Sequence, residues 1–212
     1  MADRVRIGVL LSGRGRGTNL QAILDACAEG RIPGRVAVVV SIREGAPALD
    51  RARAAGVPAV FVDPERFPDP AALDRELIRV LEAHDVDLVA LAGYMRLLGP
   101  EFLARFPGRI MNTHAALLPC FGGRGFYGRR VHEAVIESGA RFSGATVHFV
   151  DEEYDHGPII LQAVVPVQDD DTPDTLAARV LEQEHRLYVE AIRLFAEGRL
   201  TVCGRRVKIR QE

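Results

Sequence analysis

The sequence of 212 residues is poor in the features that indicate a secreted, metal-binding or membrane protein. Its three cysteines, Cys27, Cys120 and Cys203, lie far apart and are odd in number, so we predict free thiols and neither a disulfide framework nor a metal site. No apolar run approaches the roughly 20 residues of a membrane-spanning helix, and no apolar signal segment follows the first charged residues. The net charge of -2 lacks the basic excess of nucleic-acid-binding proteins. We therefore expect a cytoplasmic protein that binds neither membranes nor nucleic acids.

Short apolar runs alternate with helical patterns through the first half of the chain. The expected strands are 5–11, 36–40, 59–62, 86–92 and the run before 112, and the expected helices are 20–27, 47–55, 70–83 and a short one from 100. Continuous apolar runs are typical of parallel strands buried on both faces, and their alternation with helices is typical of a doubly wound sheet. The predicted fold class is therefore α/β, with a doubly wound, mostly parallel, Rossmann-like sheet.

The pattern changes after residue 115. The expected elements are a glycine-rich loop at 119–128, a helix at 131–138, strands at 143–150 and 159–167, a helix from 172–173 to about 196, and a hairpin of 200–202 with 207–209. Residues 143–150 alternate apolar and polar side chains, which favours an antiparallel strand. Because no low-complexity linker interrupts the chain, we expect a single domain, 1–212, whose second half is mixed and extended by antiparallel strands.

An Asn-x-His triplet ends the apolar run that precedes residue 112. Residues two apart on a strand point to the same side, so Asn112 and His114 direct an amide and an imidazole toward one spot. In open α/β sheets, ligands bind at this carboxyl edge. An amide N–H beside an imidazole is suited to stabilising an oxyanion and moving a proton. The alternative is a strand that simply ends in two polar surface residues.

The first expected strand runs into a glycine-rich loop, Ser12-Gly13-Arg14-Gly15-Arg16-Gly17-Thr18-Asn19. Backbone N–H groups of such a loop and the helix that follows it form an anion site. A P-loop needs Lys and then Ser or Thr after its last glycine, and a dinucleotide motif needs glycine at position 18 and an acid after the second strand. Both motifs fail here. A site for the phosphate monoester of a smaller molecule remains, beside the alternative of a tight turn without a ligand.

Other polar residues are compatible with two interpretations each. Asp155 belongs to the acidic turn 151–158, which is either a solvated loop or the source of a carboxylate for the site. Glu184, in the last long helix, fits either a solvated face or a buried site. The patterns also allow His132 and His148 to line the same cleft.

Taken together, the motifs resemble a known family. They are Gly-x-Gly-Thr-Asn-Leu-Gln at 15–21, Ala-Gly-Tyr-Met-Arg-Leu-Leu at 92–98, Asn-x-His at 112–114 with Leu-Leu-Pro at 117–119, Val-His-Phe-Val at 147–150 before Asp-His-Gly-Pro at 155–158, and Arg-Val at 179–180 before Gln-Glu-His at 183–185. The chain closely resembles the phosphoribosylglycinamide formyltransferases, folate-dependent enzymes of purine biosynthesis, over nearly its whole length. All enzymes that use 10-formyltetrahydrofolate share the Asn/His/Asp set, whereas the glycine loop and Gln-Glu-His are more selective.

The resemblance implies that a formyl group passes from 10-formyltetrahydrofolate, the co-substrate, to the amine of 5'-phosphoribosylglycinamide, with no metal. The residues that match the family's sites are Asn112, His114 and Asp155 for catalysis, Gly15, Gly17, Thr18, Asn19 and Glu184 for the acceptor substrate, and Met95, Arg96, Leu97, Leu98 and Glu152 for the folate. It further implies a phosphate-binding half, 1–110, and a catalytic, folate-binding half, 111–212. A homodimer is expected, as the commonest assembly of such enzymes.

The implied mechanism follows from the chemistry of these groups. Asn112 and a protonated His114 stabilise the oxyanion that forms when the amine attacks the formyl carbon. The carboxylate of Asp155 favours the charged imidazolium and relays a proton. Alignment of the two substrates supplies much of the remaining rate enhancement.

The sequence departs from the family pattern in a few places. Ala115 stands where the family usually has proline, and Ile42 where it often has asparagine. The glycine loop is two residues longer than usual, which makes Arg14 or Arg16 a hypothetical phosphate contact. The loop 120–128 matches one branch of the family and is expected to act as a mobile lid.

The sequence leaves alternatives. One is another folate enzyme, either a formyltetrahydrofolate deformylase or a formyltransferase for a different amine. The sister enzymes carry an extra domain, for which 212 residues leave no room. Another is a non-catalytic module that binds phosphate or folate without turnover. A Rossmann dehydrogenase is the weakest, because the third glycine and the acid are absent.

Overall fold

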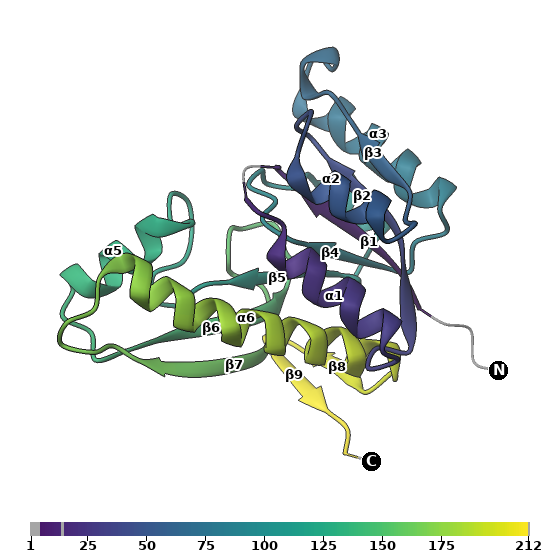
Figure 1. Cartoon of the computed structure of the whole chain (residues 1–212). Helices are drawn as coiled ribbons and strands as arrows, with labels where there is room; N and C mark the ends of the chain where they lie inside the picture. Colours follow the sequence, from purple (N-terminus) through teal and green to yellow (C-terminus); the bar gives the residue numbers. More distant parts are fainter. Residues whose placement is uncertain (1–4, 14, 212) are drawn as a thin grey trace.

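A computed structural model describes residues 5–13 and 15–211, which form one sheet with helices on both faces (Figure 1). The strands are β1 (Val5–Leu11), β2 (Gly34–Ser41), β3 (Ala59–Phe61), β4 (Leu88–Leu91), β5 (Ile110–His114), β6 (Phe142–Phe149), β7 (Ile159–Pro166), β8 (Leu200–Cys203) and β9 (Arg206–Ile209). The helices are α1 (Thr18–Ala28), α2 (Pro47–Ala54), α3 (Pro70–Ala83), α4 (Pro100–Arg105), α5 (Arg129–Glu137) and α6 (Pro173–Ala196), with a 3₁₀ turn, η1 (Pro64–Arg66).

The strand order is β3-β2-β1-β4-β5-β6-β7-β9-β8. The strands from β3 to β5 are parallel, whereas β6 pairs antiparallel with both β5 and β7. The closing hairpin joins this sheet because β9 pairs with β7 and β8 pairs with β9. The predicted fold class, a doubly wound and mostly parallel sheet with an antiparallel extension, is therefore confirmed.

Two apolar cores cover the two faces of the sheet. Alternate residues of β1 supply both: Ile7 and Val9 pack with α1, α2 and α6, and Leu10 packs with α3 and α4. Figure 1 shows α6 running along β6 from α5 toward α1, and these helices and strands are in contact. Both faces of the parallel strands are buried, which explains why their sequences are continuously apolar.

The start of α6 follows the sequence signals. Thr172 is the N-cap, Pro173 occupies the first turn, and Thr175 completes a capping box. Leu187 and Tyr188 are among the residues that the helix buries, and the same face brings Glu184 toward the end of β5. The predicted boundaries of the elements agree closely, although β4 is shorter than the predicted 86–92. Within the described residues, none of the helices has the length and apolar character needed to cross a bilayer.

Candidate active site

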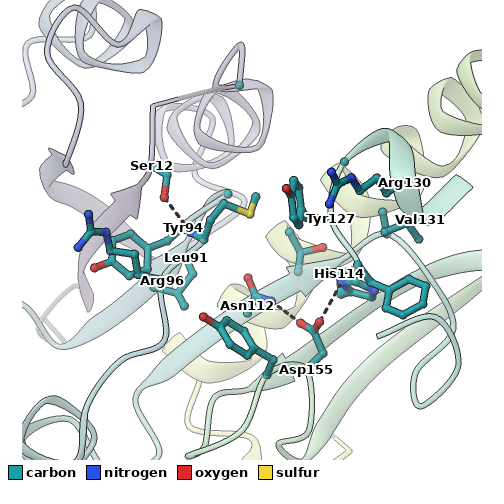
Figure 2. A pocket seen from close by; sticks show the side chains of 18 of the residues that line it. Ser12, Leu91, Tyr94, Arg96, Asn112, His114, Tyr127, Arg130, Val131 and Asp155 are labelled. Atoms are coloured by element: carbon teal, nitrogen blue, oxygen red, sulfur yellow. Dashed lines mark hydrogen bonds and ion pairs between the residues drawn. The ribbon is translucent and has the colours of Figure 1, made fainter. Parts of the chain in front are cut away.

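A cleft of about 1330 Å³ opens at the carboxyl ends of β1, β4 and β5. This is beside the switch point between β1 and β4, where the connections leave in opposite directions and where α/β folds bind ligands. Figure 2 shows the side chains that project into it, with Asn112 and His114 on either side of Asp155. Asn112 and His114, which were predicted to point to one spot at the carboxyl edge of the sheet, both line this cleft.

Asn112, His114 and Asp155 are close together. The Nδ2 atom of Asn112 donates to Oδ1 of Asp155 at 3.4 Å, and Nδ1 of His114 lies 3.5 Å from Oδ2 of Asp155. Asn112 and His114 share one face of β5 because they are two residues apart. Asp155 reaches them from the loop after β6, where its φ of 54° lies in the left-handed region. Both contacts are longer than an ordinary hydrogen bond, so these groups remain able to turn toward a ligand.

His114 is held neutral by its surroundings. Its Nε2 lies 2.8 Å from the carbonyl of Phe121, which can only accept, so Nε2 carries the proton and Nδ1 faces Asp155. Burial lowers the pKa of His114, and this effect outweighs the rise caused by Asp155 and by the bond to Phe121. The role of a protonated His114 in stabilising the oxyanion stays a prediction, because in the free site burial disfavours the imidazolium more than the carboxylate favours it.

Asp155 is ionised in the same site. Burial raises its pKa, but contact with His148, the nearby His114 and the N–H of Gly123, which donates to Oδ2 at 2.9 Å, together lower it further. His148 also lies 3.2 Å from Nδ2 of Asn112. Sequence reasoning placed His148 in the cleft but gave it no role. His148 lies opposite Asn112 in the antiparallel β5–β6 pair. Its contact with the site could be predicted only once the register of that pair was known.

The glycine loop contributes only part of what was predicted. Gly15 and Asn19 line the cleft, whereas Gly17 and Thr18 lie outside its lining at the start of α1. Gly17 has a φ of 72° and approaches Ala48 so closely that a side chain would collide. The carbonyl of Arg16 is held by Nε of Arg51 at 2.9 Å. Arg14, the other arginine considered as a phosphate contact, lies outside the described residues.

Glu184 is brought to the cleft as predicted. The hydroxyl of Thr113 donates to its Oε1 at 3.4 Å, and Asn19 also donates a side-chain hydrogen bond to it. Burial raises the pKa of Glu184 to about 7, and the two donors oppose that rise. Thr113 was not predicted as a site residue. It lies between Asn112 and His114 on β5 and points to the opposite face, toward α6.

The residues expected to contact the folate are mostly at the cleft. Met95, Arg96, Leu97 and Leu98 all line it, in the loop that follows β4. Glu152 is exposed and is not part of the lining within the described residues, so the structure does not bring it together with the others. The neighbouring residues 153–154 line the cleft instead, because the loop turns at Asp155.

The glycine-rich loop after β5 forms one wall of the cleft through residues 123–128. At its far end Arg129 pairs with Asp174 of α6, and Arg130 stacks over the ring of Tyr127 at 5.1 Å from its centre (Figure 2). His132 follows in α5, buried and lining the cleft as the sequence allowed. The described residues contain no group of His, Cys, Asp and Glu arranged to hold a metal ion.

A parallel sheet with a polar cleft at its switch point defines an α/β protein that acts on small molecules. Residues 5–192 match the family described as formyl transferase, and the chain belongs to this family. It is 43% identical over 210 residues to the chloroplastic phosphoribosylglycinamide formyltransferase of Arabidopsis thaliana, a match that covers 99% of this chain and 69% of that protein. Within the family, the chain is a member of the phosphoribosylglycinamide formyltransferases, as the resemblance of its motifs implied.

Solved structures agree with this placement. Glycinamide ribonucleotide transformylase 1 from Symbiobacterium toebii superposes with a TM-score of 0.94 at 54% identity, covering 100% of this chain and 96% of that one. A formyltetrahydrofolate deformylase from Pseudomonas syringae pv. tomato superposes with a TM-score of 0.86 at 25% identity, covering 99% of this chain and 67% of that one. The deformylase shares the fold at a lower level of sequence similarity.

Proposed function

We propose that this protein transfers the formyl group of 10-formyltetrahydrofolate to the amine of phosphoribosylglycinamide, a step of purine biosynthesis. One observation carries the proposal: Asn112, His114 and Asp155 meet in a single cleft. Gly15, Asn19 and Glu184 form one part of that cleft, and residues 95–98 form another. Different segments of the lining are therefore available to a phosphate-bearing amine and to a folate.

Asn112 supplies the donor for the developing oxyanion. When the amine adds to the formyl carbon, negative charge forms on the formyl oxygen, and a charge-assisted hydrogen bond from Nδ2 is stronger than the long contacts it makes in the free site. Asp155 accepts from Nδ2, and Nε2 of His148 lies 3.2 Å from the same nitrogen, so the two residues hold the amide in place, and the formyl oxygen replaces one of these two contacts.

His114 accepts the proton that the amine loses. Because Nε2–H is held by the carbonyl of Phe121, Nδ1 is the basic atom, and it faces the carboxylate of Asp155. Protonation at Nδ1 creates an imidazolium beside that carboxylate, which stabilises the new charge. When the tetrahedral intermediate collapses, its bond to N10 of the folate breaks and that nitrogen takes the proton, directly or through water, so that tetrahydrofolate leaves. The neutral resting state of His114 is the state that this step requires.

The remaining residues bind the two substrates. We assign the acceptor's phosphate to the N–H groups of Gly15 and the start of α1, with Gly17, Thr18 and Asn19 around them, and the ribose hydroxyls to Glu184. We assign the folate to Met95, Arg96, Leu97 and Leu98 with residues 153–154. In this proposal residues 1–110 hold the phosphate, residues 111–212 carry the catalytic groups, and the whole chain acts as one domain.

The direct test follows the absorbance of 10-formyltetrahydrofolate in the presence of purified protein, with and without glycinamide ribonucleotide. Turnover that requires the ribonucleotide supports the transfer reaction and the acceptor site. Turnover at the same rate without it identifies a deformylase and removes the phosphate-site assignment. Binding of both compounds without turnover identifies a binding module.

We also propose that the protein is a cytoplasmic homodimer. Support comes from the three cysteines, which are free as a reducing compartment requires, and from the prevalence of two-fold dimers among soluble enzymes. Sedimentation equilibrium distinguishes a species of 23.2 kDa from one of twice that mass.

A further inference from the structure

Ser12 joins two loops that the sequence places 80 residues apart. It is buried, at the point where β1 ends and the glycine loop begins. Its backbone N–H donates to the carbonyl of Gly93 at 3.1 Å, and its Oγ accepts from the N–H of Met95 at 2.8 Å (Figure 2). A single residue of the glycine loop thus holds two positions of the loop after β4.

These bonds extend the contact between β1 and β4 past the edge of the sheet. The regular β1–β4 ladder ends at the pair Leu10 and Leu91, followed by the bond from Ala92 N–H to the carbonyl of Leu10 at 2.9 Å. At a switch point the two connecting segments turn away from one another, so ordinary ladder bonds cannot continue there. Ser12 supplies the link with its side chain.

The other end of the same loop is held independently. The N–H of Gly99 donates to Oδ2 of Asp74 at 2.6 Å, and Asp74, in α3, is buried. Asp74 lies on the face of the sheet opposite α1 and belongs to no part of the glycine loop. The loop 93–99 therefore has one anchor that it shares with the glycine loop and one that it does not.

We propose that Ser12 is a positioning residue that couples the binding of the two substrates. The inference rests on the proposed function, in which the glycine loop binds the acceptor's phosphate and residues 95–98 bind the folate. Ordering of either loop by its own ligand restrains the other loop through Ser12, so the second ligand loses less conformational freedom when it binds. Such coupling is reciprocal, so each ligand tightens the binding of the other by the same factor.

The test is a calorimetric binding cycle with glycinamide ribonucleotide and tetrahydrofolate, a pair that cannot react because the folate carries no formyl group. In the wild-type protein, saturating tetrahydrofolate is expected to tighten binding of the ribonucleotide by about 5-fold or more, the lower end of typical coupling. In Ser12→Ala the factor is expected to fall below the wild-type value, because the Oγ acceptor for the N–H of Met95 is lost while the backbone bond to Gly93 remains. Ser12→Thr retains a hydroxyl and is expected to keep most of the coupling.

Asp74→Ala is the matched control, since it removes the other anchor of the same loop. It is expected to weaken tetrahydrofolate binding while the coupling factor stays at the wild-type value. Thermal melts establish that each variant is folded. The inference is overturned if wild-type protein binds the two ligands independently, or if Ser12→Ala keeps the full factor. Failure of the proposed function looks different, because a deformylase does not bind glycinamide ribonucleotide at all and a binding module gives no turnover in the absorbance assay.

Discussion

The imidazole of His114 and the carboxylate of Asp155 face one another across 3.5 Å, with 7% and 11% of their side chains exposed. Burial lowers the pKa of His114, and Asp155 raises it by a smaller amount. The carboxylate therefore limits how far the pKa of the imidazole falls. A base with a lowered pKa is neutral over a wider range of pH, which suits a group that must accept a proton near neutrality.

Asp155→Asn is predicted to move the acid limb of the pH profile to lower pH. Activity decreases where His114 becomes protonated, and removal of the adjacent negative charge lowers the pKa of His114 further. The measurement is kcat from pH 5 to 8 under saturating substrates. Asp151→Asn, an acid of the same loop that pairs with His156, is the control and should leave the limb in place. An unchanged limb in Asp155→Asn would show that another group titrates there.

Asn112→Ala is predicted to reduce kcat/KM by about 10²–10³, equivalent to about 2.7–4 kcal/mol, the usual loss for one oxyanion donor. The affinity for each substrate alone should change little, because the strong hydrogen bond forms only in the transition state. Steady-state kinetics with both substrates measures the loss. Gln183→Ala, which removes an amide from the partly exposed face of α6, serves as control. A variant with near-wild-type kcat contradicts the assignment of Asn112.

Local patterns predicted much of this molecule because they are set by neighbours in the sequence. The alternation along β5 was sufficient to place Asn112 and His114 on one face, and Thr172 with Pro173 marked the start of α6. Other features depend on contacts between distant segments. The antiparallel register that puts His148 opposite Asn112 is one, and the bond that fixes the tautomer of His114 through Phe121 is another.

Three of the predicted site residues, Glu152, Gly17 and Thr18, lie outside the lining of the cleft. The family resemblance implied a folate contact for Glu152, but residues 153–154 line the cleft in its place, in the loop that turns at Asp155. Gly17 and Thr18 belong to the glycine loop, but the close approach of Gly17 to Ala48 holds them outside the cleft that Gly15 lines. In both loops the backbone conformation is set by packing that no short motif encodes.

Tyr188→Phe is predicted to destabilise the protein by about 1–3 kcal/mol. The ring is fully buried in α6, and its hydroxyl lies 3.0 Å from the carbonyl of Leu91 and 2.9 Å from that of Met111. The hydroxyl shares its proton between one carbonyl of β4 and one carbonyl of β5. Phenylalanine leaves both carbonyls without that donor. Thermal unfolding should show a decrease of about 2–4 °C per kcal/mol. Tyr127→Phe, at an exposed ring, should stay within about 0.5 kcal/mol of wild type, and an equal result for Tyr188→Phe contradicts the prediction.

Thr113→Val is predicted to shift the pH dependence of acceptor binding to higher pH. The pKa of Glu184 is about 7 because burial raises it, while the hydroxyl of Thr113 and the amide of Asn19 favour the ionised form. Only the carboxylate accepts hydrogen bonds from both ribose hydroxyls, so affinity should rise with pH through about 7, at most about tenfold per pH unit. Loss of the Thr113 donor raises the pKa of Glu184 and hence the midpoint.

The substrate's own phosphate also titrates, with a second pKa of about 6, so the dependence has two sources that must be separated. Glu184→Gln removes the protein's contribution and leaves that of the phosphate, which makes it the reference for calorimetric titrations of glycinamide ribonucleotide from pH 6 to 9.

The same variant has a predicted effect on folding. A carboxyl whose pKa is raised in the folded state binds more protons there, so the free energy of unfolding decreases as pH rises from about 4.3 to 7. Glutamine abolishes that decrease, and the melting temperature of Glu184→Gln relative to wild type should therefore be higher at pH 8 than at pH 5. A midpoint that is identical in wild type and Thr113→Val would show that the hydroxyl does not act on Glu184.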